Sequence, residues 1–103
     1  MQLEHESLIN LKKEILRVVK AHLPLDEYRV FFFGSRAAGT NMSKSDIDIG
    51  IEGPEKIPPK AFFEIMDELQ KIPTFYKIDL VDFGDVSREF KEEATRAVEL
   101  ISY

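Results

Sequence analysis

The sequence predicts an α+β fold in which helices pack on one face of a small mixed β-sheet. Three segments carry apolar residues at helical spacing, and three shorter runs rich in isoleucine, valine and aromatic residues are typical of strands. Proline or glycine lies at most of the boundaries between them. The order is helix, strand, strand, helix, strand, helix, and the 103 residues suit a single domain spanning residues 1–103.

Two of the helices are defined both by apolar spacing and by prolines. The first is expected over residues 7–23 and stops at Pro24. The second opens at Pro58 and Pro59, because a proline in a first turn lacks only an N–H that would be unpaired there anyway, and it ends at Pro73. A third helix is predicted near the C-terminus from an apolar stripe that contains Phe90, Ala94, Ala97, Val98 and Ile101.

The three strands are expected at residues 28–33, 46–51 and 76–83. The middle run alternates strictly between isoleucine and another residue, which is a strand signal. Side chains two residues apart on a strand point the same way, so Asp46 and Asp48 project together from one face.

The composition excludes several classes of protein. The formal net charge of −5 argues against a general nucleic-acid binder, and the absence of cysteine removes disulfides, zinc–thiolate sites and a cysteine nucleophile. The acidic N-terminus lacks the basic and apolar regions of a signal peptide, and no apolar stretch approaches the ~20 residues of a membrane span. We therefore expect a cytoplasmic protein without a membrane or nucleic-acid partner.

Some motifs in the chain resemble known sites but are incomplete. Gly34 and Gly39 have the spacing of a phosphate-binding P-loop, but Thr40 stands where the lysine should be. The two histidines, His5 and His22, are isolated in the sequence and are interpreted as surface residues near helix ends.

A phosphate-binding turn is predicted directly after the first strand. Gly34 permits close approach of the backbone, and free N–H groups at a helix start attract phosphate. The Ser35 hydroxyl and the forked Arg36 guanidinium are further donors to the same oxygens.

A cluster of carboxylates is predicted on the next two strands. Asp46 and Asp48 repel each other, and a divalent cation relieves that repulsion. If the third strand pairs alongside, Asp79 adds a third carboxylate. Such a cluster fits a site with two Mg²⁺ ions, one carrying a triphosphate and the other lowering the pKa of an attacking hydroxyl. The predicted activity is transfer of a nucleoside monophosphate from a nucleoside triphosphate to a hydroxyl acceptor.

Each of these pieces is weak evidence alone, because an aspartate pair on a strand is more often a solvated sheet face. Their order along the chain is more specific. It reads Phe33-Gly34-Ser35-Arg36-Ala37-Ala38-Gly39, then Ser45-Asp46-Ile47-Asp48-Ile49, then Ile78-Asp79-Leu80-Val81-Asp82. This order resembles the small minimal nucleotidyltransferases (MNT) of bacteria and archaea, within the DNA polymerase β superfamily, from residue 32 to residue 82.

The resemblance implies a fold like the polymerase β palm and a role for each motif. Gly34 and Ser35 would hold the triphosphate. Asp46 and Asp48 would bind Mg²⁺, and the third acidic residue, which we map to Asp79 rather than Asp82, would complete the metal site and help to activate the acceptor.

The resemblance also implies a partner. Proteins of this family are commonly encoded beside a small helical HEPN-type or substrate-binding protein, and in several pairs the two form a toxin–antitoxin module. There the nucleotidyltransferase adds AMP to a tyrosine of the HEPN toxin. The resemblance alone therefore implies ATP as the nucleotide, a HEPN-type acceptor and a homo- or hetero-oligomer.

Two other functions remain open from the sequence. The chain can be an antitoxin that neutralises its partner by binding alone, or a module that binds nucleotide without turnover. The complete set of carboxylates favours the enzyme, because binding alone would not require it.

Overall fold

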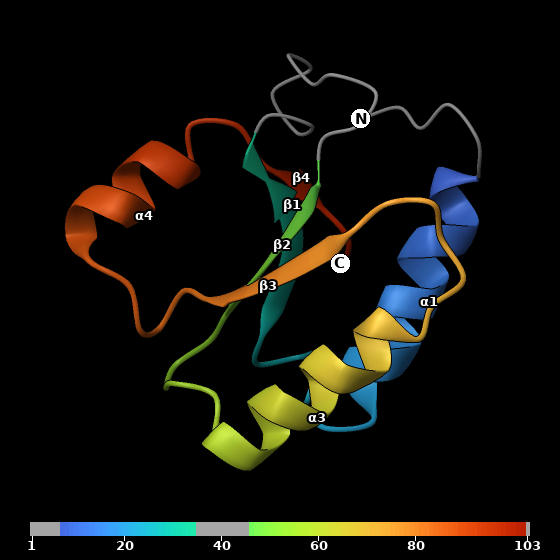
Figure 1. Ribbon diagram of the computed structural model, residues 1–103. Coiled ribbons are helices and arrows are strands. Elements are labelled where there is room, and N and C mark those ends of the chain that lie inside the picture. The colour runs from blue at the N-terminus through green and yellow to red at the C-terminus, as the bar shows by residue number, and fades with distance from the viewer. Residues whose placement is uncertain (1–6, 35–45, 103) are drawn as a thin grey trace.

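The computed structural model describes residues 7–34 and 46–102. Its sheet contains four strands in the order β3-β2-β1-β4. They are β1 (Arg29–Phe33), β2 (Ile47–Glu52), β3 (Ile78–Asp82) and β4 (Glu99–Leu100). The strand β1 runs antiparallel to both β2 and β4, whereas β2 and β3 are parallel. The predicted small mixed sheet and its three predicted strands are confirmed (Figure 1).

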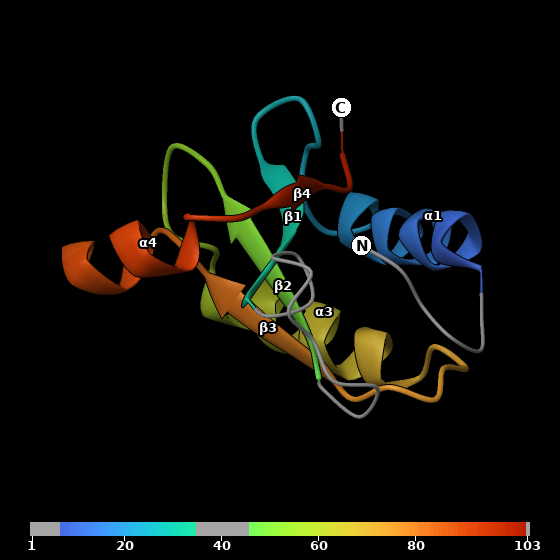
Figure 2. The same cartoon turned by 90° about the horizontal axis from the view of Figure 1, so that it is seen from above.

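Three helices are present in the described residues: α1 (Leu8–Lys20), α3 (Pro59–Gln70) and α4 (Arg88–Ala94). Figures 1 and 2 show α1 and α3 on one side of the sheet and α4 on the other. The prediction that helices pack on one face therefore holds for α1 and α3 but not for α4. None of the helices in the described ranges is long and apolar enough to cross a bilayer.

The helix ends follow from local hydrogen bonding. The Ser7 hydroxyl accepts a hydrogen bond from the Asn10 backbone N–H at 3.2 Å and caps α1. Ser87 caps α4 in the same way, accepting from the Phe90 N–H at 3.0 Å. The helix α3 has no side-chain cap and opens on Pro59, as the sequence predicts.

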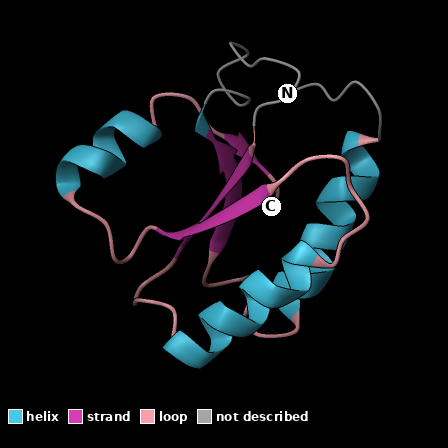
Figure 3. Cartoon of the chain, viewed as in Figure 1, coloured by secondary structure: helices cyan, strands magenta, loops and turns pink. Residues whose placement is uncertain are grey.

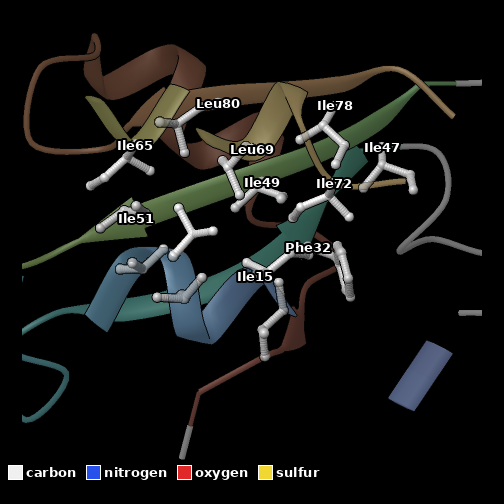
Figure 4. Close-up of a cluster of buried hydrophobic side chains, with 14 of the residues drawn as sticks. Ile15, Phe32, Ile47, Ile49, Ile51, Ile65, Leu69, Ile72, Ile78 and Leu80 are labelled. Carbon is white, nitrogen blue, oxygen red and sulfur yellow. The ribbon is translucent and has the colours of Figure 1, made fainter. Parts of the chain in front are cut away.

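The main core lies between the sheet and the two helices α1 and α3. The isoleucines Ile47, Ile49 and Ile51 of β2 are fully buried there, which confirms the alternation read from the sequence. They pack with Ile15 of α1 and Ile65 of α3, as Figure 4 shows. Because these side chains fix which face of β2 is buried, they also fix which face carries its aspartates.

The opposite face of the sheet carries a smaller aromatic cluster. Phe31 and Phe33 each contact Phe83 edge-on, with ring centroids 5.0 Å apart in both pairs. Phe90 of α4 covers this cluster, with its ring centroid 5.8 Å from that of Phe83. The helix α4 lies on this face because the alternating side chains of β1 place two phenylalanines there, and their burial needs a cover.

The C-terminal segment differs from the prediction. A helix was expected to extend through Val98 and Ile101, but α4 ends at Ala94 and Glu99–Leu100 forms β4. The outer edge of β1 explains this, since the Val30 carbonyl accepts hydrogen bonds from the backbone N–H groups of Ile101 and Ser102 at 2.8 and 3.1 Å.

The prediction for His22 is also corrected. Its side chain is only 16% exposed and lies between α1 and α3. Its Nδ1 atom lies 3.2 Å from a carboxylate oxygen of Glu64, and Nε2 contacts the carboxylate of Glu68. This arrangement could not be predicted from the sequence, because the histidine and the glutamates are more than forty residues apart.

Removing bulk from the main core should cost much more stability than removing it from the surface. We expect Ile49→Ala to lower the free energy of unfolding by about 2–5 kcal/mol, because Ile49 is fully buried and leaves a cavity. The control is Ile9→Ala, at a residue that is 67% exposed, with an expected change below about 0.5 kcal/mol. Urea denaturation measures both, and equal losses would contradict the assignment of the core.

Candidate active site

The candidate site lies where β1 ends and β2 begins, on the face of the sheet opposite the main core. Phe33, the last residue of β1, is the antiparallel register partner of Asp48. Gly34 follows at once and lies against the Asp48 carboxylate. Asp46 immediately precedes β2 and is exposed. Gly34, with which the predicted turn begins, and the predicted aspartate pair thus meet at one end of the sheet.

Asp79 joins them from the third strand. In the parallel register of β2 and β3, Asp48 and Asp79 are direct partners, so their side chains leave the same face next to each other. Both are partly buried. Lys77, two residues earlier, approaches Asp79 with its Nζ atom 3.9 Å from the carboxylate. Lys77 was not predicted as a site residue, although its spacing of two residues from Asp79 places both side chains on the same face of the strand.

The surroundings of the Asp48 carboxylate disfavour its charged form. Burial is the main reason that its pKa is raised above the ordinary value for aspartate, and the negative charges of Asp79 and then Asp46 raise it further. Three aspartates from two strands therefore act on one another. A cation bound among them would relieve both the burial penalty and the repulsion.

The backbone at Gly34 requires glycine. Its φ of +80° lies in the left-handed region that side chains disfavour. A Cβ atom built there would also lie 2.5 Å from the Asp48 Oδ2 atom. The absence of a side chain thus lets the chain pass directly beside the buried carboxylate.

The structure gives Asp82 a different role from Asp79. Its side chain leaves the other side of β3, and both carboxylate oxygens accept backbone hydrogen bonds. The Ile57 N–H donates to Oδ2 at 2.9 Å and the Gly84 N–H donates to Oδ1 at 2.8 Å. Asp82 therefore links the loop before α3 to the loop after β3 by hydrogen bonds. Asp79 is the carboxylate that faces Asp48.

Two predicted site residues, Ser35 and Arg36, lie outside the described residues. Across residues 7–34 and 46–102, no three histidine, cysteine, aspartate or glutamate side chains converge into a ready-made metal site. The Asp48–Asp79 pair is nevertheless a suitable donor set for Mg²⁺. This ion usually takes one or two carboxylates from the protein and the rest of its ligands from water and substrate phosphates.

Comparison with known proteins places this geometry in a family. Residues 26–102 match the family described as "Polymerase beta, Nucleotidyltransferase". The chain is also similar to the "Probable protein adenylyltransferase MntA" of Haemophilus influenzae, with 29% identity over 86 residues. That alignment covers 82% of this chain and 75% of the relative.

Solved structures share the fold. A chain of a toxin–antitoxin complex with AMP-PNP superposes with a TM-score of 0.70 at 22% identity, over 87% of this chain and 71% of its own length. A chain of a complex between the tri-AMPylated HEPN toxin of Shewanella oneidensis and its MNT antitoxin superposes with a TM-score of 0.67 at 18% identity, over 89% and 69%. The family match over residues 26–102 includes Asp46, Asp48 and Asp79.

The requirement for glycine at Gly34 can be tested by substituting alanine, which adds one methyl group. We expect Gly34→Ala to lower the free energy of unfolding by about 1–3 kcal/mol, because of the positive φ and the contact with Asp48. Adding Asp48→Ala to this variant should recover part of the loss, since it removes the close contact but not the backbone strain. Urea denaturation measures both effects. A Gly34→Ala protein as stable as the native one would contradict the geometry described here.

The pKa of Asp48 predicts a cost to folding at neutral pH. A carboxyl whose pKa is raised in the folded state binds its proton more tightly there than in the unfolded chain, so stability falls as the pH rises through its titration. We expect Asp48→Asn to be more stable than the native protein at pH 7, and the difference to shrink in acid. Asp85→Asn, at an exposed residue, is the control. A stability difference independent of pH would contradict the prediction.

Proposed function

The chain belongs to the Polymerase beta nucleotidyltransferase family, and on that basis we propose that it transfers AMP from ATP to a hydroxyl of a partner protein. Nucleotidyl transfer is the activity of the family. The name of the Haemophilus influenzae relative supports protein as the acceptor and AMP as the group transferred. The observation that carries the proposal is the register of β2 and β3, which pairs Asp48 with Asp79 beside Gly34.

The proposed acceptor is a tyrosine of a HEPN-type toxin, with this chain as its antitoxin. Two of the similar structures are toxin–antitoxin complexes, and in one of them the HEPN toxin carries AMP. The structure adds one physical argument. No helix of the described residues covers Asp48 and Asp79, so a second protein can approach them past these elements.

Each site residue has a proposed role. Gly34 leaves space for phosphate beside the carboxylates, and Ser35 and Arg36 would donate to phosphate oxygens. Asp46, Asp48 and Asp79 would hold Mg²⁺ together with the triphosphate. The ion, when bound, would neutralise charge that develops on the phosphates and lower the pKa of the acceptor hydroxyl.

The reaction then follows in one displacement. The acceptor oxygen attacks the α-phosphorus of ATP, the bond from that phosphorus to the bridging oxygen breaks, and pyrophosphate leaves. The hydroxyl proton passes to Asp79, whose side chain is 44% exposed and so can be reached by the acceptor. Asp48 remains ionised to hold positive charge beside the triphosphate.

The proposal is tested by mass spectrometry of the HEPN-type product of a neighbouring gene after incubation with this protein, ATP and Mg²⁺. We expect a mass gain of one or more AMP groups. It should fall by at least about a hundredfold in Asp46→Asn/Asp48→Asn and in Asp79→Asn, because each removes ligands needed in the transition state. Asp67→Asn, at an exposed residue of α3 that pairs with Lys71, is the matched control and should retain full activity.

Three outcomes separate the functions that the sequence leaves open. A mass gain that depends on the aspartates supports the transferase. A stable complex that neutralises the toxin without any mass gain contradicts it and favours an antitoxin that acts by binding alone. Binding of ATP without release of pyrophosphate, with the partner present, would favour a nucleotide sensor.

A further inference from the structure

A second feature lies on the open edge of the sheet. A cavity of about 650 Å³ runs along the outer side of β3, and none of the proposed catalytic residues lines it. Its lining residues belong to β3, the start of α3, the loop before that helix and the loop that follows β3. Figure 3 shows the helices in cyan, the strands in magenta and the loops in pink. The apolar lining residues include Pro58, Phe62, Phe63, Leu80 and Val86. We call this cavity the β3 groove.

The backbone of β3 offers hydrogen bonds to this groove. In the parallel ladder, the residues Ile78, Leu80 and Asp82 direct their N–H and C=O groups away from β2. The Ile78 carbonyl accepts from the Gln70 side chain at 2.8 Å, and the Asp82 carbonyl accepts from the Asp85 N–H at 3.1 Å. Between them, the Leu80 N–H donates no hydrogen bond, and the Leu80 C=O accepts none, within the described residues.

The charged groups around the groove are already engaged. Lys56 pairs with Asp85 at 3.0 Å across its mouth. Both oxygens of Asp82 accept backbone N–H groups. An incoming molecule therefore finds apolar walls, one free pair of backbone groups and a small excess of negative charge among the lining residues. This surface matches an extended apolar peptide segment and disfavours an acidic one.

We propose that the β3 groove binds an extended apolar segment of the partner protein, which adds to the sheet as a strand along the edge of β3. One residue of the segment would pair its N–H and C=O with those of Leu80, and its alternate side chains would contact Phe62 and Phe63. The side chain of Phe63 is 70% exposed, so its ring is available for such a contact.

A second copy of this chain is a poor occupant of the groove. The chain has a formal net charge of −5, and the charged lining residues Lys56, Asp82 and Asp85 also carry a negative excess, so two copies would repel each other there. The proposed occupant is therefore an extended segment of another protein.

The groove also has a position suited to the transfer reaction. Asp79 and Val81 lie on the same face of β3 two residues apart, and Val81 lines the groove. A segment docked along β3 would hold the acceptor protein next to the carboxylates. In this respect the inference rests on the proposed function, because it assigns the groove to the protein that receives AMP.

Binding is measured separately from transfer. The probes are overlapping synthetic peptides that cover the HEPN-type partner, titrated into the full chain. We expect one peptide to bind, and Phe63→Ser to weaken its affinity by about tenfold. The control, Phe75→Ser, changes the same residue type at a site that is 80% exposed and outside the groove, and should leave the affinity unchanged.

Hydrogen exchange distinguishes strand addition from simple apolar contact. The amide proton of Leu80 should exchange markedly more slowly when the peptide is bound. N-methylation of the peptide should weaken binding strongly at one residue only, because only the Leu80 carbonyl is left to accept a peptide N–H. If Phe63→Ser binds as well as the native chain, or Leu80 exchange is unchanged in the complex, the inference is wrong.

The assay separates failure of the groove from failure of the proposed function. AMP transfer to the intact partner that is unaffected by Phe63→Ser, with no peptide bound, would leave the transferase standing and overturn the docking site. Peptide binding with the expected Leu80 protection, but no AMP transfer, would support the docking site and overturn the proposed activity.

Discussion

The parallel pairing of β2 with β3 is the constraint on which the candidate site depends. It places Asp48 directly opposite Asp79, and both carboxylates repel each other on a partly buried surface. Nothing local favours this arrangement, because the charged forms lose hydration and gain repulsion. The register is held instead from the other face, where the isoleucines of β2 and Ile78 and Leu80 of β3 are packed under α1 and α3.

The two faces of the sheet therefore have different roles. The face under α1 and α3 supplies most of the apolar burial and so most of the stability. The other face carries an aromatic cluster next to the aspartates, because Phe33 of that cluster is the register partner of Asp48. The helix α4 contacts the cluster through Phe90. A helix over the whole face would bury the carboxylates and close the route to an acceptor.

Most of this architecture could be predicted from the sequence, because its signals are local. The alternation of isoleucine and aspartate in β2 fixes both a buried face and a charged face, and prolines mark the ends of α3. The strand β4 could not be predicted, since Glu99–Leu100 becomes a strand only by pairing with β1 about seventy residues earlier. The contacts of His22 with Glu64 and Glu68, and the choice of Asp79 over Asp82, likewise depend on long-range packing and register.

The glycine in the middle of β2 limits how the acidic cluster can be assembled. Gly50 follows Asp46 and Asp48 on the same face, and a Cβ atom there would lie 2.6 Å from the rings of both Phe31 and Phe83. A third carboxylate in series on that strand has no room. The third carboxylate of the site can therefore come only from the neighbouring strand. The number of negative charges at the site thus depends on which strands are paired and in which register. A change that slipped β3 by one residue would turn Asp79 to the other face and break the cluster without altering a single acidic residue.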